Sequence, residues 1–463
     1  MTVATPPPPS TGLSGAAWIR AKLFPNIWSG ILTVVLVPIL LYLVYRTALF
    51  VFVNADWEAV ERNLTLFMQG TFPRDQQWRL VAQIFLFALA LGVGAGTASA
   101  TARDRALQAG LAYRPRTLGS VLRRFWSLIA FVLILLYFAS TVTPWLVVLG
   151  AVALAIIGLQ SYRLPTSFRL YGWLLMALLL VAGFQVVSGT TGRAWLVMAM
   201  VVGVGAWSLT ESSRIAPGWG TWALKTVAVV VSTIVVFLVY SVVTVPGVGW
   251  DKWSGLHLTL WVSALAIVLS FPIGLFLALA RRSTLPALRW LATTYIELIR
   301  GVPLISLLFL GQYVLGFMLP AGTTLSSISR AIAAMTLFTA AYVAEIVRGG
   351  LQSLPVGQIE AGQALGLSTP SVMRLIVLPQ ALRAVIPAMV GQFISLFKDS
   401  SLLSIIAILE FLGVRSLIHA QPDFRVTAHA ETLVFVAVGY WAFAYAMSRE
   451  SQRLEGRLRV GYG

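Results

Sequence analysis

The chain contains no cysteine, and charged residues make up only 11% of its 463 residues. The lack of cysteine excludes disulfide bonds, thiolate metal sites and cysteine nucleophiles. The three histidines, His257, His419 and His429, never have the His-x-x-x-His spacing of a helical zinc site. No Gly-x-Ser-x-Gly nucleophile elbow occurs either. We therefore expect no catalytic residues and no metal site in this chain.

Hydrophobic residues fill the sequence instead, at 58% of the chain and a mean hydropathy of +0.86. They form repeated runs of about 20 residues, the length that crosses a bilayer as a helix. Run length and weak alternation favour helices over a transmembrane barrel. We predict an all-α polytopic membrane protein with twelve spans. They cover residues 30–52, 79–99, 124–140, 145–160, 170–187, 194–210, 222–244, 257–280, 291–318, 329–348, 384–397 and 430–447.

A further apolar stretch, residues 400–418, contains Glu410 and Arg415 and starts directly after Asp399. Ionisable residues are costly in a spanning helix. We therefore expect a half-buried or re-entrant helix here. A full span would instead place the C-terminus on the other side of the membrane.

The formal net charge of +17 does not indicate nucleic acid binding, because the basic residues are scattered through loops and form no single stripe. With the N-terminus inside, about two thirds of the 33 lysine and arginine residues fall in segments on the inner side. The positive-inside rule therefore predicts that both termini are cytoplasmic.

The segment Gln358–Pro379, QIEAGQALGLSTPSVMRLIVLP, has the punctuation of two short helices joined by a bend. Gly366 fits the residue after a helix end, and Ser368 or Thr369 fits the cap of the next helix. Pro379 is expected to break or kink the chain before the next apolar span. The charge count places this segment on the cytoplasmic side.

This segment resembles the cytoplasmic signature of ABC-importer permeases, Glu-Ala-Ala, three residues, Gly, nine residues, Ile-x-Leu-Pro. The residues in register are Glu360, Ala361, Gly366, Ile376, Leu378 and Pro379. Gly362 departs from the pattern, since the second alanine is usual there. The flanking sequences YIELIRGVPL and FKDSSLLSIIAILE are similar to the polar and general L-amino-acid subfamily. The resemblance covers roughly residues 250–459.

The resemblance implies a type I importer permease core of five helices, preceded here by about seven extra transmembrane helices. We expect three parts: a disordered Pro-rich cytoplasmic tail (1–29), a helical extension (30–244) and the permease domain (245–463), with a coupling loop at 351–383. The resemblance makes the signature a coupling helix that docks on a cytoplasmic ATPase. Glu360 offers the partner a charge, and Ala361 and Gly362 permit close approach.

The resemblance also implies a bacterial inner membrane, with lipid around the spans, and it implies the protein partners. These are a cytoplasmic ABC ATPase dimer, an extracytoplasmic amino-acid-binding protein and a second permease subunit, for which a heterodimer is expected in preference to a homodimer. The chain contains no Gly-x-x-x-x-Gly-Lys-Ser/Thr loop. We therefore expect it to bind no cofactor itself, with ATP and Mg²⁺ held by the partner ATPase.

Two acid–base pairs lie in or beside predicted spans, Glu297 with Arg300 and Glu345 with Arg348. Each pair is three residues apart and can meet on one helix face. Two interpretations stay open: intrahelical ion pairs near the membrane surface, or groups that gate or line a solute path.

Polar and small residues recur at helical spacing before the 400–418 stretch, at Ala388, Gln392, Ser395 and Asp399. One interpretation is a solute path, to which Ser400, Ser401 and Glu410 would add polar groups. The other is a polar contact between two permease protomers.

The sequence thus predicts the permease subunit of an ATP-driven amino acid importer, a transport subunit and not an enzyme. Two alternatives stay open: an ion-driven secondary transporter that works without an ATPase, and a structural or assembly subunit. A secondary transporter of this kind would show inverted repeats with broken helices at mid-membrane, and the sequence contains none that we recognise.

Overall fold

The structure is a computed structural model that describes residues 15–108, 110, 144–163, 169–189, 247–320, 325–425 and 428–459. Predicted spans 124–140, 194–210 and 222–244 lie outside these residues. The described chain is helical, and its β pairing is the isolated bridge between Gly255 and Glu410. It divides into two compact units, Met1–Ala59 and Val60–Gly463, each considered by itself below.

The smaller unit contains helix α1 (Gly15–Leu23) and helix α2 (Ile27–Leu49), which continues as a π-helical turn, η1 (Phe50–Asn54). Helix α1 lies inside the tail 1–29 that was expected to be disordered. The difference follows from composition, because the prolines precede Gly15 and the segment AAWIRAKL consists mainly of good helix formers. Asn26 caps α2 by accepting a hydrogen bond from the Ser29 amide at 2.8 Å.

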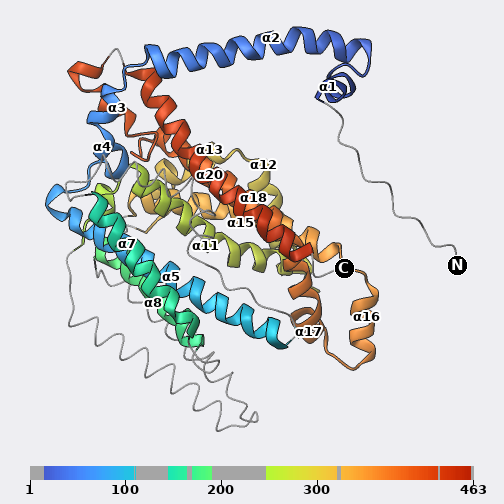
Figure 1. The fold of residues 1–463 in the computed structure, drawn as a ribbon. Coiled ribbons are helices and arrows are strands. Elements are labelled where there is room, and N and C mark those ends of the chain that lie inside the picture. Colours follow the sequence, from blue (N-terminus) through green and yellow to red (C-terminus); the bar gives the residue numbers. More distant parts are fainter. Residues whose placement is uncertain are drawn as a thin grey trace. The chain divides into compact units, whose positions relative to one another are not determined.

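The larger unit begins with the helical extension. Helix α5 (Gln77–Gln108) packs along α7 (Pro144–Leu159) and α8 (Arg169–Ser188), as Figure 1 shows. Glycine permits the close approach of α5 and α7: a Cβ on Gly92 would lie 2.2 Å from the Ala155 carbonyl oxygen, and one on Gly158 would lie 2.6 Å from the Leu89 carbonyl oxygen. Small residues at such crossings are typical of membrane helix packing.

The five predicted helical segments of the permease core are all present. They are α11 (Gly255–Arg281), the pair formed by α12 (Pro286–Gly301) and α13 to α14 (Leu304–Met318), α15 (Ser327–Gln352), α18 (Leu378–Asp399) and α20 (His429–Arg459). Across the described residues, seven helical segments are long and apolar enough to cross a membrane, or eight if the bent pair counts as one span.

The predicted single span 291–318 is wrong in one respect, because α12 and α13 are bent by 106° at a short break. Val302 is extended, with ψ 135°, and Pro303 follows it. A residue before proline is disfavoured in the helical region, and proline offers no amide to continue the hydrogen-bond ladder. Gly301-Val302-Pro303 therefore ends α12.

Helix α15 is the central helix of the core, and two thirds of its most apolar stretch is buried. Met335, Ala340, Ala341 and Val343 have no exposed surface. Its longest contact is with α11, where Gly274 leaves no room for a side chain: an added Cβ would lie 2.6 Å from Cγ1 of Val343. Small residues thus allow α11 and α15 to form the axis of the permease core.

The part of the extension that precedes α5 packs on this core. Phe67, in helix α4 (Leu64–Gln69), is fully buried. Its ring centroid lies 4.8 Å from that of Phe435 and 6.0 Å from that of Phe411. The Ser254 hydroxyl, just before α11, accepts a hydrogen bond from the Thr71 amide at 2.6 Å. The extension is therefore attached to the permease core through the residues that precede α5.

Residues 400–418 form neither a span nor a single helix. A 3₁₀ helix, η8 (Ser400–Ile406), is followed by Ala407 with φ +61°, a turn, and the short helix α19 (Arg415–His419). The Glu410 side chain holds the turn together. It accepts hydrogen bonds at 2.8 Å from the amides of Leu412 and Gly413, and one at 2.7 Å from the Tyr440 hydroxyl.

Glu410 has no exposed surface, and burial raises its pKa to about 7 in spite of these hydrogen bonds. The uncharged carboxyl therefore suits the fold best. Its contribution to stability is complete below the ordinary pKa of 4.5 and is lost as pH rises through about 7.

We expect the thermal unfolding midpoint of the purified full chain to fall as pH rises from 5 to 8.5, by the equivalent of at most about 3 kcal/mol. Glu410→Gln cannot ionise and should flatten this pH dependence. Unfolding of detergent-solubilised protein across that pH range measures both slopes. An unchanged slope in Glu410→Gln would show that another group controls it.

Candidate functional site

The candidate site is the segment between α15 and α18, which lies at one end of the larger unit in Figure 1. It contains helix α16 (Gly357–Ala364) and helix α17 (Thr369–Val372). The bend between them is the predicted one. Gly366 has φ +78°, its amide donates to the Gln363 carbonyl at 2.9 Å, and the Leu367 amide donates to the Gly362 carbonyl at 3.1 Å. These two bonds form a Schellman motif, which requires a left-handed residue at Gly366.

Pro379 does not break the helix, although the sequence predicted a break or kink there. Helix α17 continues through a π-helical turn, η7 (Met373–Val377), into α18, so that one helical segment runs from Met373 to Ile406. Pro379 lies in the first turn of α18, where its missing amide costs least. The π turn directly before Pro379 is wider than an α-helical turn and leaves room for the proline ring. In a regular α-helix the ring would clash with the carbonyl four residues earlier.

Gly362 was expected to permit close approach of the ATPase, but it faces the next helix of its own chain. It is buried, and a Cβ there would lie 2.9 Å from Cγ2 of Val372 and 3.2 Å from Cδ1 of Ile376. The close approach that Gly362 permits is therefore between α16 and the next helix of its own chain. Leu378 is partly buried in the same apolar cluster as Val372.

The opposite side of α16 is open. Glu360 and Ala361 are exposed, and Leu365, one turn after Ala361, is 81% exposed. Val356 just before the helix and Leu375 in the π turn are 65% and 64% exposed. An acidic group beside exposed apolar side chains, on a segment between spanning helices, suits a protein contact.

Both ends of this segment are fixed to the membrane helices. The Gln380 side chain donates to the Gln358 side-chain oxygen at 2.8 Å and to the Ile376 carbonyl at 2.9 Å, which joins the start of α16 to the start of α18. No local sequence signal indicates this bond, because the two glutamines are 22 residues apart.

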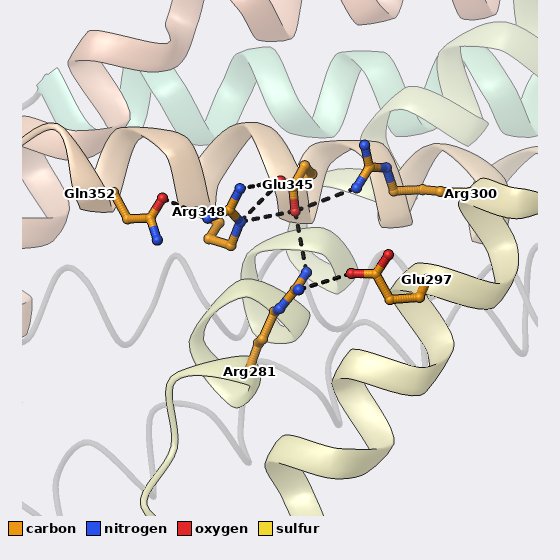
Figure 2. Close-up of polar contacts among 6 residues, drawn as sticks. All are labelled: Arg281, Glu297, Arg300, Glu345, Arg348 and Gln352. Carbon is orange, nitrogen blue, oxygen red and sulfur yellow. Dashed lines mark hydrogen bonds and ion pairs between the residues drawn. The ribbon is translucent and has the colours of Figure 1, made fainter.

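At the other end, an ionic network joins α15 to α11 and α12, as Figure 2 shows. Glu345 accepts from Nε of Arg348 at 3.0 Å and from Nη1 of Arg281 at 3.3 Å. Nη1 of Arg300 lies 3.6 Å from the same carboxylate. Nη2 of Arg281 also donates to Glu297 at 2.8 Å. Arg348 in turn donates to Gln352, the last residue of α15.

The predicted pair Glu345–Arg348 is confirmed, whereas the predicted pair Glu297–Arg300 is wrong. Glu297 pairs with Arg281 and Arg300 pairs with Glu345, so both contacts cross between helices. Sequence spacing missed Arg281, the residue that connects the two acids. The sequence does contain one indication of this contact. Arg281 is the last residue of its span, α11, and so lies at the same membrane surface as the two acids.

The residues proposed for a solute path separate into two groups. Ala388 and Ser395 of α18 are exposed, and Gln392 and Asp399 are half-buried, so this helix face has an open side. Ser400 is buried and donates to the Phe397 carbonyl at 2.6 Å, while the half-buried Ser401 donates to the Lys398 carbonyl at 2.8 Å. Glu410 is enclosed in its turn and lines no open surface.

Gly366→Ala should destabilise the bend by about 1–2 kcal/mol, because alanine is strained in the left-handed region. Gly357→Ala is the matched control: a Cβ has free space at both positions, but Gly357 lacks a positive φ. Hydrogen exchange of the amides at 362–367 should be about tenfold faster or more in Gly366→Ala alone. Equal exchange in the two variants would contradict a left-handed bend.

Glu345→Gln should lower stability by about 1–3 kcal/mol, because three arginines lose their common partner in a site where Glu345 is 23% exposed. Glu297→Gln should cost less than about 1 kcal/mol, since Glu297 is 57% exposed. Thermal unfolding of the two variants in the same detergent compares them. A larger loss at Glu297 would place the centre of the network elsewhere.

Comparison with known proteins is consistent with this geometry. Residues 270–460 match the family described as the binding-protein-dependent transport system inner membrane component. The Escherichia coli inner membrane amino-acid ABC transporter permease protein YhdY is 43% identical over 210 residues, which are 45% of this chain and 57% of that protein. The Rhodobacter capsulatus glutamate/glutamine/aspartate/asparagine transport system permease protein BztC is 42% identical over 215 residues, 46% of this chain and 49% of that protein.

The match spans about half the length of these two relatives. A shorter relative is matched almost entirely: the probable glutamine ABC transporter permease protein GlnP of Bacillus subtilis is 37% identical over 205 residues, 44% of this chain and 92% of that protein. These matches confirm the resemblance that the Gln358–Pro379 signature indicated. The chain is a multi-pass membrane protein that belongs to the family of binding-protein-dependent transport system inner membrane components.

Proposed function

We propose that the chain is the permease subunit of an ATP-driven amino acid importer. The observation that carries the proposal is the surface formed by Glu360, Ala361 and Leu365, which is exposed on a segment whose two ends are fixed to membrane helices. A cytoplasmic ATPase dimer that binds this surface can pull on α15 and α18 together. ATP and Mg²⁺ are held by that partner.

The solute class follows from the relatives, whose names specify amino acids or glutamine and related solutes. Both termini and the α16–α17 segment are cytoplasmic, in line with the distribution of lysine and arginine. An extracytoplasmic binding protein delivers the solute on the other side. The solute then passes along the open face of α18, where Gln392, Ser395 and Asp399 provide polar groups for an ammonium and a carboxylate.

A second permease subunit completes the path. The open face of α18 presents Ala384, Ala388 and Gly391, all exposed in the single chain. Small residues of this kind favour close helix contact in membranes. Alternating access requires two halves around a common cavity. We propose a related permease as the second half, in preference to a copy of this chain.

Reconstitution tests the function directly. The full chain is co-expressed with candidate ATPase, permease and binding-protein partners and placed in liposomes. Uptake of labelled glutamate and glutamine is then measured together with ATP hydrolysis. We expect uptake only with the ATPase and ATP present. Uptake that continues without the ATPase would favour an ion-driven secondary transporter.

Glu360→Lys should reduce ATPase attachment and ATP-dependent uptake by about tenfold or more, because it reverses the charge that faces the partner. Membrane insertion should be unchanged, since Glu360 is exposed. Glu61→Lys, the same change at an exposed site that the charge distribution places outside, is the control. Equal uptake by the two variants would show that α16 is not the coupling surface.

A further inference from the structure

A pocket of about 520 Å³ opens beside the turn that follows η8, between the adjoining ends of α19 and α20. Its polar lining consists of Arg415, His419, His429 and the hydroxyls of Ser404 and Ser416. Ala407, the residue with φ +61°, forms part of the wall. The volume lies in the range of about 300–1,000 Å³ that is usual for small-molecule sites. Neither the coupling segment nor the open face of α18 uses this pocket.

Arg415 is held in position by its neighbours. Its Nε donates to Oγ1 of Thr432 at 3.1 Å, and Nη2 donates to the His429 carbonyl at 2.8 Å. These bonds fix the plane of the guanidinium and leave Nη1 for another acceptor. A guanidinium that is oriented before binding loses little freedom when an anion arrives.

The two imidazoles lie against each other, with ring centroids 3.9 Å apart. Nε2 of His429 is 3.2 Å from the Arg425 carbonyl, which can only accept. Nε2 of His419 is 3.2 Å from the Thr432 hydroxyl, whose own proton goes to the Ala428 carbonyl at 2.7 Å. Both Nε2 atoms therefore carry hydrogen, and both hydrogens are used by acceptors within the chain.

The charge of the pocket selects the sign of its ligand. Burial lowers the pKa of His419, and the neighbouring His429 and Arg415 lower it further. Arg415 gives the pocket a positive charge. This charge disfavours a metal cation between the two histidines and favours an anion.

We propose that this pocket binds a carboxylate, held by the guanidinium of Arg415 through Nη1. The proposal rests on the proposed function only for the side of the membrane, which places the pocket outside. There the carboxylate can come from a dissolved amino acid or dicarboxylate, or from an acidic side chain of the docking binding protein. The chemistry that the pocket recognises is the same for both sources.

Binding is measured by calorimetry on the full chain in lipid nanodiscs, without ATPase or binding protein, so that failure of the import activity does not affect the result. The first probe is glutarate, with glutaramide as its uncharged counterpart. The second is a blocked pentapeptide, Gly-Ser-Glu-Ser-Gly, with Gln in place of Glu as its counterpart. Arg415→Gln is compared with Arg425→Gln, the same substitution at an exposed arginine in the same outer loop.

We expect at least one carboxylate probe to bind, with an affinity at least about tenfold higher than that of its uncharged counterpart. Arg415→Gln should lower the affinity for that probe about tenfold, and Arg425→Gln should leave it unchanged. Binding of glutarate alone assigns the pocket to a dissolved acid, and binding of the peptide shows that it admits a protein side chain. Three results would overturn the proposal: no binding of either probe, equal binding of the uncharged counterparts, or equal losses in the two arginine variants.

Discussion

One carboxylate, Glu345, keeps the adjoining ends of three helices together. Arginines from α11, α12 and α15 all contact it, and each is at most about one third exposed. Charges in such a place require partners, because neither lipid nor a packed core solvates them. The network therefore fixes where α15 ends. The end of α15 in turn sets where the next segment begins, and therefore how the surface that contains Glu360 is oriented.

The segment itself is stiff for a second reason. Gly362 lets α16 lie directly on Val372 and Ile376, and Gln380 joins its start to the start of α18. A force applied at the exposed side of α16 therefore reaches α15 through the backbone and α18 through packing. At Gly362, the glycine that departs from the signature, helix propensity is lower than with the usual alanine. Its burial against the neighbouring helix counteracts the loss of helix propensity.

The sequence predicted those features that depend on a few neighbouring residues. Spans at α5, α11, α15 and α20 follow from long apolar runs, and the bend at Gly366 follows from a glycine at the end of a short helix. Features that depend on distant residues were missed or misassigned. Arg281 contacts Glu345, which is 64 residues away in the chain, and Phe67 contacts Phe411 only because the segment before α5 folds back on the core. Residue spacing along one helix contains no information about either contact.

The contacts of Phe67 and Thr71 with the permease core have a consequence for how the chain could be shortened. Phe67 covers Phe411 and Phe435, and Thr71 is bonded to Ser254 at the entry to α11. A truncated protein that starts at Trp250 would keep every residue of the family signature. It would nevertheless expose aromatic rings beside the turn that Glu410 holds together. One end of the permease core is thus covered by residues far upstream of the region 270–460 that matches the family.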